Sequence, residues 1–454
     1  MIYEGLFKHV LFPMYETTVR RRPTASYIAD YERSQWLSAD ELTALKLRKL
    51  NALLSHCWEH VPYLRKHWEE AGCEPTALRD MAEFSRYPVL TKAEITANYA
   101  DMIAVPWRGR TLSKSTSGST GIPFKSEYTM DVYARRTAVM WRGYDWAGAG
   151  LGTRTAYLWG TGLRTEGWGA IKDRLYHGAF NRNFFDAMSL SDDNIDSTIE
   201  AMRRYHPRAV VGYVAPLLAV ARRINATGRF ITGLRGVLTG AEPLHGPERL
   251  EIEAAFKAPV FNTYGSREVM LMASECERRE GLHVNQDHLL LETLDDTGRP
   301  VSAAASGDVA VTDYHNLGMP LVRYLNGDRA TYASSPCSCG RCLPLLSSID
   351  GRVLDLIKTP DGQHVPGEFF VIVMLSATHV KQWQVKQLTK DSLEMRVIPT
   401  EGWNDGMRRQ IEDQIEMKTG PSMRVTVRPV DHIDTTASGK RRLTIALPRE
   451  VETA

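Results

Sequence analysis

Hydrophobic positions in the first hundred residues recur near a helical period. Leucines gather between Leu42 and Leu54 at a spacing close to 3.6 residues, which is typical of a helix with one buried face. Ser38, followed by two acidic residues, is a suitable start for this helix. Further along, Thr91 follows a short extended segment and is placed to cap a helix that begins before Glu94. The N-terminal region is therefore predicted to be mostly helical.

Between residues 130 and 264 the pattern alternates between two periods. Short apolar runs, typical of buried strands, are separated by amphipathic stretches of ten or more residues. Such alternation predicts parallel sheets that are covered by helices on both faces. We expect helices over residues 130–144, 193–205, 215–226 and 246–256, and strands over residues 155–160, 209–213, 236–239 and 260–264.

The pattern changes again near residue 285, where strands dominate. Apolar runs over residues 289–293 and 308–312 suit a smaller, more antiparallel unit. The last hundred residues are typical of a separate lobe. In it we expect a hairpin from strands 380–388 and 392–398, a helix over 405–419 that ends at Gly420, and a strand over 423–427.

Together these patterns predict an α/β fold. A large N-terminal domain of helix-covered, mostly parallel sheets, with a strand-rich subdomain, precedes a small mobile α+β C-terminal domain. Composition and the order of motifs place the boundary between residues 1–352 and residues 353–454.

Composition narrows the class of protein without pointing to a function. Of 454 residues, 43% are hydrophobic and 24% are charged, and the formal net charge is +2. A chain so nearly neutral has no global field that recruits nucleic acid or an anionic membrane, and its apolar runs are too short to span a bilayer. The N-terminus lacks the features of a secretory signal. We therefore expect a cytoplasmic protein whose partners include neither nucleic acid nor a membrane.

The segment Lys114–Lys125 contains five hydroxyl residues, two glycines and two lysines. Inward-facing backbone N–H groups in such a loop can form a concave anion site, to which hydroxyls and a lysine add donors. The alternative is a solvated surface loop. Neither a Walker loop nor a strand–GxGxxG–helix unit is present, so a phosphate-binding role requires another nucleotide-handling architecture.

Three turns with a nearby acid follow predicted strands. They are Thr239–Pro243, Tyr264–Glu268 and Tyr324–Asp328. Any one of them alone is typical of an ordinary turn. Because ligands of open parallel sheets gather beyond the carboxyl ends of the strands, the three together favour a shared binding site.

In their order along the chain, these motifs resemble those of the adenylate-forming superfamily of acyl-CoA synthetases, non-ribosomal peptide adenylation domains and luciferases. The chain is most similar to the phenylacetate-CoA ligase and CapK-like branch, over nearly its whole length. Residues 116–123 match the phosphate loop, and Asp328 matches the ribose-binding aspartate. The resemblance assigns nucleotide binding to Thr116, Ser117, Gly118, Ser119, Thr120, Gly121, Gly240, Ala241, Glu242, Pro243, Tyr264, Gly265, Ser266, Asp328 and Arg352.

The sequence departs from the family pattern at three positions. Arg267 replaces a usual threonine, and Leu354 replaces the first acid of the hinge motif that begins at Gly351-Arg352. Phe124 stands after Pro123, where the resemblance implies a lysine, and this displaces Lys125 from that position. The catalytic charge is therefore assigned to Lys440, in the C-terminal Thr435–Lys440 segment that is similar to the family's lysine loop.

The resemblance implies an ATP-dependent ligase that joins a carboxylic acid to AMP, releases pyrophosphate, and transfers the acyl group to coenzyme A. Lys440 and Glu268 would be catalytic, with Glu268 also binding Mg²⁺ through oxygen. Rotation of the C-terminal lobe would withdraw Lys440 between the half-reactions. The alternatives are transfer to a carrier-protein phosphopantetheine or to an amine and, in a different class, a zinc-stabilised nucleotide-binding scaffold without turnover.

Four of the six cysteines lie in a pattern with one histidine. Cys276 and His283 are followed about fifty residues later by the run Cys337-x-Cys339-x-x-Cys342, a spacing compatible with a tetrahedral Cys₃His zinc site but unlike a compact finger. Reduced, partly buried thiols are the alternative. Similar pieces form a structural zinc site in some phenylacetate-CoA ligase-like sequences, so we favour Cys276, His283, Cys337 and Cys339 as ligands, with Cys342 as a competitor for the fourth position.

The acyl substrate is the least determined feature. Tyr213 follows a predicted strand end and is a candidate for the acyl pocket, although aromatic residues at such positions are also common in cores. At the level of the family the expected substrate is an aromatic or heteroaromatic carboxylic acid. A homodimer is a further possibility that the sequence leaves open.

Overall fold

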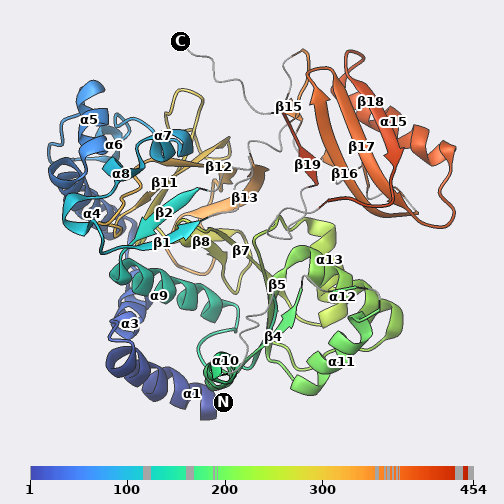
Figure 1. The fold of residues 1–454 in the computed structure, drawn as a ribbon, viewed down its shortest axis with the longest axis horizontal. Coiled ribbons are helices and arrows are strands. Elements are labelled where there is room, and N and C mark those ends of the chain that lie inside the picture. The colour runs from blue at the N-terminus through green and yellow to red at the C-terminus, as the bar shows by residue number, and fades with distance from the viewer. Residues whose placement is uncertain are drawn as a thin grey trace. The chain divides into compact units, whose positions relative to one another are not determined.

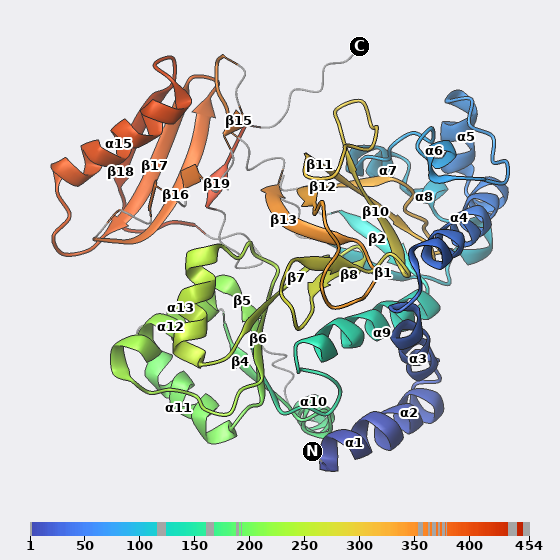
Figure 2. The same cartoon turned by 180° about the vertical axis from the view of Figure 1, so that it is seen from behind.

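The structure is a computed structural model that describes most of the chain in two compact units. The described residues are 2–115, 124–159, 168–187, 190–191, 193–352, 357–361, 364–365, 369–370, 373–374, 377, 379–434 and 443–447. The first unit comprises Met1–Asn326 and Thr331–Ser348, and the second comprises Gly327–Ala330 and Ile349–Ala454. The predicted domain boundary at residue 352 stays a prediction. Figures 1 and 2 show the two units from opposite sides.

The N-terminal region is helical, as the leucine spacing predicted. Its elements are α1 (Ile2–Leu6), η1 (Phe7–Leu11), α2 (Phe12–Met14), η2 (Tyr15–Val19), α3 (Thr24–Ser34), α4 (Ala39–His60), α5 (Pro62–Glu70), α6 (Met81–Phe84), α7 (Lys92–Ala97), α8 (Tyr99–Met102) and η3 (Val105–Trp107). Ser38 and Glu41 form a capping box at the start of α4, and Thr91 and Glu94 form another at α7. Both predicted helix starts are confirmed because these reciprocal hydrogen bonds satisfy the first backbone N–H groups.

A long mixed sheet forms the centre of the first unit. Its order is β10-β11-β12-β13-β9-β8-β7-β6-β5-β3-β4. From β4 to β7 neighbouring strands are parallel. The parallel strands are β3 (Thr155–Trp159), β4 (Arg182–Asp186), β5 (Ala209–Tyr213), β6 (Gly236–Gly240) and β7 (Val260–Ser266), and the helices around them are α9 (Met130–Trp146), α10 (Trp168–Ala179), α11 (Ile195–Tyr205), α12 (Val214–Thr227) and α13 (Gly246–Phe256).

Apolar residues alternate between the two faces of this parallel region. Val210, Val237 and Val260 pack with the buried residues of α11, α12 and α13, the helices coloured green in Figure 1. Their neighbours Val211 and Leu238 belong to a separate core on the opposite face, which includes Tyr144 of α9. Since successive strand residues point to opposite faces, burial on both sides explains the unbroken apolar runs in the sequence.

The sheet becomes antiparallel beyond β7, as the sequence predicted for the strand-rich region. β7 pairs antiparallel with β8, and β10 pairs antiparallel with β11. The strands are β8 (Met270–Glu275), β9 (Leu282–Val284), β10 (Leu289–Leu294), β11 (Ser306–Asp313), β12 (Tyr324–Tyr332) and β13 (Leu345–Arg352), and a separate hairpin joins β1 (Leu112–Ser115) to β2 (Lys125–Tyr128). The same sheet thus changes character at β7.

Buried ion pairs connect α9 to the strand-rich part of the first unit. The Arg142 guanidinium donates to Asp287 at 2.5 Å, and Arg136 donates to Asp313 at 2.6 Å, with all four side chains almost fully buried. Burial alone raises the pKa of Asp287, but the neighbouring Arg142 brings it below its ordinary value. Removing one partner of such a pair leaves an uncompensated buried charge, so these contacts fix α9 against the sheet.

The second unit is a four-stranded sheet with one long helix. Its order is β18-β17-β16-β19, and Ile411 and Ile415 of the helix pack with Val385 and Met395 of the sheet. The elements are β14 (Ile357–Lys358), β15 (His364–Val365), β16 (Val380–Thr389), β17 (Ser392–Pro399), α15 (Asp405–Thr419), β18 (Arg424–Pro429) and β19 (Thr444–Ile445). The predicted hairpin and helix are confirmed, and Gly420 follows α15 with a positive φ of 83°.

The predicted α/β class is correct, but several elements were not predicted, among them α10 and β4. α10 and the edge strand β4 did not appear in the pattern, because Arg182-Asn183-Phe184-Phe185-Asp186 is charged at both ends and has only two apolar residues. None of the helices in the described part of the chain is long and apolar enough to cross a membrane.

Candidate functional site

A row of residues crosses the carboxyl ends of the parallel strands. Trp159 of β3 follows the Leu158–Gly212 pair and is level with Tyr213 of β5, which is itself paired with Gly240 of β6. The rings of Trp159 and Tyr213 lie 4.2 Å apart between centroids, and both side chains are partly buried. Ligands of open α/β sheets bind at this kind of edge. The row therefore joins two aromatic side chains to the first of the predicted nucleotide turns.

The turn after β6 is tightly built. A Cβ atom at Gly240 would lie 2.7 Å from Thr263 Oγ1, so the strand cannot accept a larger residue without rearrangement. Ala241 has a φ of 67°, a conformation that is costly for a residue with a side chain and frequent at functional sites. Glu242 accepts a hydrogen bond from the backbone N–H of Ala215 at 2.8 Å, and Pro243 follows. Since Ala215 lies in the first turn of α12, Glu242 also fixes the position of the adjacent Tyr213.

The second motif, Tyr264–Glu268, spans the end of β7 and the connection to β8. A Cβ atom at Gly265 would lie 2.3 Å from the carbonyl oxygen of Met270, so the hairpin requires glycine there. Tyr264 is buried, and its hydroxyl accepts a hydrogen bond from Asn326 at 2.9 Å. The hydroxyl of Ser266 is buried and has no hydrogen-bond partner within the described part of the chain. An orphaned buried hydroxyl of this kind fits a site that a polar ligand completes.

Glu268 is nearly buried beside two longer-range partners. Its Oε1 atom lies 3.9 Å from Lys92 Nζ and 3.4 Å from the Tyr324 hydroxyl, and its side chain is 7% exposed. Both contacts are longer than optimal hydrogen bonds. The nearly buried carboxylate thus offers oxygen atoms of the kind that a hard cation such as Mg²⁺ prefers.

Several predicted site residues lie outside the described residues, or are described only by their place in a strand. Thr116, Ser117, Gly118, Ser119, Thr120 and Gly121 of the phosphate loop, Leu354 of the hinge, and Lys440 lie outside the described residues. The residues on either side of the loop pair as β1 and β2, with Ser115 opposite Lys125. Asp328 lies within β12, and Arg352 is the last residue of β13. Their roles remain as the resemblance implies them.

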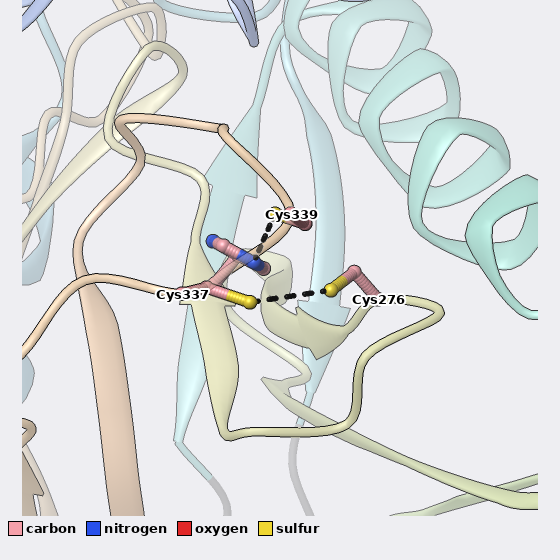
Figure 3. Close-up of side chains that lie close together, drawn as sticks. Cys276, Cys337 and Cys339 are labelled. Atoms are coloured by element: carbon pink, nitrogen blue, oxygen red, sulfur yellow. Dashed lines mark hydrogen bonds between the residues drawn. The ribbon is translucent and has the colours of Figure 1, made fainter.

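A second constellation brings the predicted cysteines and histidine together. Cys276 follows β8, His283 lies in β9, and Cys337 and Cys339 lie in the connection between β12 and β13. Their ligand atoms all lie within 4.8 Å of one another, and the three cysteines point toward a common centre in Figure 3. Cys342 is exposed and does not belong to this group.

The separations within this group fit a tetrahedral zinc ion. Zinc–sulfur bonds of about 2.3 Å imply sulfur atoms about 3.8 Å apart. The sulfurs of Cys276 and Cys337 are separated by 3.7 Å, and Cys339 Sγ lies 3.3 Å from His283 Nε2. His283 Nδ1 is bonded to the carbonyl oxygen of Leu343 at 3.2 Å, which leaves Nε2 facing the thiols.

Backbone donors and burial prepare the same atoms for a metal. The N–H groups of Arg278 and Arg341 donate to the sulfurs of Cys276 and Cys339, each at 3.4 Å. Burial raises the pKa of the Cys276 thiol and lowers the pKa of His283, which keeps the imidazole neutral. Burial also acts on Cys339, but hydrogen bonds from Arg341 bring its pKa below the ordinary value. Zinc binds neutral histidine and ionised thiol, so the pKa shifts of His283 and Cys339 favour the metal, whereas burial of Cys276 opposes ionisation until a metal is bound.

Comparison with known proteins finds relatives over most of the chain. It is 26% identical over 440 residues to a phenylacetate-coenzyme A ligase of Thermus thermophilus, covering 90% of this chain and 98% of that protein. It is 22% identical over 378 residues to protein CapK of Staphylococcus aureus, covering 80% of each. A model of the CapK C-terminal domain matches residues 357–446. These similarities support the phenylacetate-CoA ligase and CapK-like branch that the motifs indicated.

The fold of the chain agrees with a solved relative. A crystal structure of 2-hydroxyisobutyryl-CoA ligase, in the postadenylation state with an acyl-adenylate, has a TM-score of 0.73 at 19% identity and is covered over 91% of both chains. At that identity the similarity speaks for the fold alone. The predicted branch and fold class are therefore confirmed.

Sequence reasoning missed two contributors to the candidate site. Trp159 was predicted to lie in a strand but was not assigned to the site. Its contact with Tyr213 depends on how β3 pairs with β5, which the sequence does not show. Lys92 was considered only as the residue after a helix cap, and its approach to Glu268 comes from a long-range contact that no local pattern encodes. In both cases only the register or the tertiary contact carries the signal.

Proposed function

We propose that this protein is an AMP-forming acid–thiol ligase that activates a carboxylic acid with ATP and transfers the acyl group to coenzyme A. The observation that supports this most directly is the gathering of the Gly240–Pro243 and Tyr264–Glu268 motifs along one end of the parallel sheet. The similarity to the phenylacetate-coenzyme A ligase of Thermus thermophilus, which covers 90% of this chain and 98% of that protein, supports the same proposal. We further propose that it acts in the cytoplasm.

The first half-reaction joins the substrate to AMP. A carboxylate oxygen attacks the α-phosphorus of ATP, the new P–O bond forms, and the bond to the β-phosphate oxygen breaks to release pyrophosphate. Negative charge accumulates on the phosphates, so positively charged and hydrogen-bonding groups must be in place beforehand. Lys440 would neutralise the α-phosphate, and the 116–123 loop would hold the β- and γ-phosphates.

The second half-reaction replaces AMP by sulfur. The thiol of coenzyme A loses its proton and attacks the acyl carbon, a C–S bond forms, and AMP leaves with the bonding electrons. Asp328 is proposed to hold the ribose hydroxyls through both steps. Withdrawal of Lys440 by a hinge near Arg352 would make room for the thiol, as the family resemblance implies.

Two metals have separate proposed tasks. Glu268 would hold Mg²⁺, which neutralises phosphate charge when bound. Cys276, His283, Cys337 and Cys339 would hold a structural zinc ion that links the β8–β9 region to the β12–β13 connection. A closed four-ligand site of this type stabilises the fold and leaves no open position for substrate.

The acceptor has an alternative. The acyl-adenylate could instead pass to a carrier-protein phosphopantetheine or to an amine, because similarity to CapK does not fix the acceptor. A nucleotide-binding scaffold without turnover is the remaining class, because fold alone does not fix function. The adenylation chemistry is shared by the first two and absent from the third.

The aromatic pair at the sheet edge supports an aromatic acyl group. Trp159 and Tyr213 present partly buried rings beside Gly240. Planar rings in an offset arrangement offer faces and edges that match another ring better than a flexible chain. We propose that the acid is a small aromatic carboxylic acid.

Acid-dependent release of pyrophosphate is expected with at least one aryl acid. The measurement is pyrophosphate release from ATP across a panel of aryl, amino and fatty acids, followed by thioester formation with free coenzyme A. Release without thioester would favour the carrier or amine acceptor. Absence of acid-dependent release across the panel would support the scaffold instead.

Trp159→Ala is expected to weaken use of the preferred aromatic acid. Loss of an aromatic partner and its buried area predicts an increase in KM for the acid of about tenfold or more. Since the proposed role of Trp159 concerns only the acyl group, KM for ATP should change little, and Trp159→Phe should retain most of the activity. Equal changes in both constants would indicate a general folding defect.

A further inference from the structure

Lys92 lies in the candidate site although no part of the proposed function uses it. Its Nζ atom is 3.9 Å from Glu268 Oε1 and 5.1 Å from the ring centroid of Phe124. The lysine side chain is 36% exposed, whereas that of Glu268 is 7% exposed. The ammonium therefore stands at the open side of a nearly buried carboxylate.

The fold positions this lysine through several long-range contacts. Leu90 forms an isolated parallel bridge with Tyr324, in which the N–H of Leu90 donates to Arg323 O at 3.0 Å and the N–H of Leu325 donates to Leu90 O at 2.9 Å. Thr91 then caps α7, so that Lys92 begins the helix. The segment before α7 is in effect an added strand beside β12, and it brings Lys92 next to Tyr324.

The buried side chain of Arg323 also holds the segment that precedes α7. The Arg323 guanidinium donates to the carbonyl oxygen of Ser85 at 2.9 Å and to that of Gly298 at 2.8 Å, and it pairs with Glu292 at 3.1 Å. Arg323 is 1% exposed. Together with the bridge between Leu90 and Tyr324, these contacts hold the backbone that leads into α7, and so they place the start of the helix at Lys92.

Positive charge gathers around Arg267, the residue that precedes Glu268. Lys114 lies within electrostatic range of Arg267, and burial together with the charges of Arg136 and Arg267 lowers its pKa. Arg267 is exposed, and in the described part of the chain it forms no ion pair. Arg136 is already paired with Asp313. A polyanion beside Glu268 would relieve this excess of positive charge.

The sequence gives a reason for a lysine to approach the site from another segment of the chain. The family resemblance places a lysine directly after the proline of the phosphate loop, and here that position is Phe124. Lys92 holds its ammonium against the Phe124 ring, a favourable cation–π contact. Phe124 also stacks on Tyr324, with ring centroids 5.7 Å apart and planes at 10°. Phe124, which replaces the lysine of the loop, thus supports the ammonium of a different lysine, Lys92.

We propose that Lys92 is a phosphate-binding residue whose ammonium contacts the β- and γ-phosphates of ATP and stabilises the departing pyrophosphate. This inference rests on the proposed function, because it assumes that ATP occupies the site at Glu268. It goes beyond that function by assigning the leaving-group charge to a residue of the N-terminal helical region. AMP has neither of the phosphates concerned, so it should not sense Lys92.

The test measures the binding of ATP and of AMP by isothermal titration calorimetry, in buffer with Mg²⁺ and in buffer with EDTA. The variants are Lys92→Met, which keeps the apolar stem over Phe124, and Lys92→Arg, which keeps the charge. Lys125→Met is the matched control, since Lys125 follows Phe124 but pairs with Glu127 at 3.6 Å. Thermal melting of each variant checks that the fold is retained.

Lys92→Met should weaken ATP binding about ten- to a hundredfold in both buffers, the size expected for a lost charge-assisted hydrogen bond. Its affinity for AMP should stay within about twofold of the wild-type value, Lys92→Arg should recover most of the ATP affinity, and Lys125→Met should bind both ligands normally. Unchanged ATP binding by Lys92→Met, or equal loss of ATP and AMP affinity, would overturn the proposal.

If Lys92→Met lost ATP affinity only in the buffer with Mg²⁺, the proposed direct contact between Lys92 and the phosphates would also be overturned. Lys92 would then act through Glu268 and the metal. Failure of the proposed function gives a different result. A scaffold without turnover would bind ATP but release no pyrophosphate in the acid panel, and a protein without a nucleotide site would bind no ATP in either buffer.

Discussion

Replacing Lys440 with alanine is expected to abolish formation of the acyl-adenylate while largely sparing thioester formation from preformed acyl-adenylate. A fixed cation at the α-phosphate acts only while charge builds there, and loss of one such group typically costs about 10²–10³-fold in rate. The second half-reaction forms a C–S bond and has no pyrophosphate to expel. The two half-reactions should therefore separate in this variant.

The measurement uses two assays on the same preparation. Acid-dependent pyrophosphate release reports the first half-reaction, and thioester formation from synthetic acyl-adenylate and coenzyme A reports the second. Lys418→Ala is a suitable control, because Lys418 is an exposed lysine in the last turn of α15 in the same unit. Equal loss of both half-reactions in Lys440→Ala would contradict the model of a rotating lobe.

Departures from the family pattern do not remove the chemistry that the site needs. Arg267 stands where threonine is usual, and it adds a positive charge beside Glu268 in the chain. Phe124 takes the place of a lysine in the loop, yet its ring supports the ammonium of Lys92. Under the proposed function, both changes would keep positive charge near the phosphates and would move its source from the loop to neighbouring elements.

Local periodicity predicted most of the regular structure. The bounds of β5, α13 and α15 agree with the predicted ranges, because each has a clear period and a clear stop such as Gly420. The edge strand β4 was missed since an exposed edge needs fewer apolar residues than a buried strand. Short elements are thus the ones that the hydrophobic pattern predicts least well.

The candidate site was predictable where it consists of short motifs. Gly240 and Gly265 are glycines because a Cβ atom would collide with Thr263 and with Met270, which is a local demand visible in the sequence as a fixed motif. The meeting of Lys92 with Glu268 depends instead on the bridge between Leu90 and Tyr324. Contacts between distant segments leave no periodic trace, so they could not be inferred without the structure.

The candidate zinc site was predictable from the sequence in part. Its four residues were identified from spacing and family resemblance, and the structure brings their ligand atoms within 4.8 Å of one another. Spacing alone could not decide between Cys339 and Cys342, because both lie near Cys337. The geometry separates them, since Cys342 is exposed and outside the group.

Cys276→Ser is expected to cost the protein its zinc and much of its thermal stability. Zinc binding contributes about 10–16 kcal/mol in zinc-finger peptides. Even a fraction of that exceeds the effect of most single substitutions, which is about 0.5–3 kcal/mol. Here the metal would join segments that are distant in the sequence, so its loss should free the β12–β13 connection and lower the melting temperature.

The cysteine outside the cluster provides the matched control for this variant. Elemental analysis of protein purified without added metal should find about one zinc per chain in the wild type and in Cys342→Ser, and much less in Cys276→Ser. Chelation of the wild type should reproduce the melting behaviour of Cys276→Ser. If the wild-type protein held no zinc and all its thiols reacted in a titration, the four residues would be reduced core side chains, and burial rather than a metal would explain their proximity.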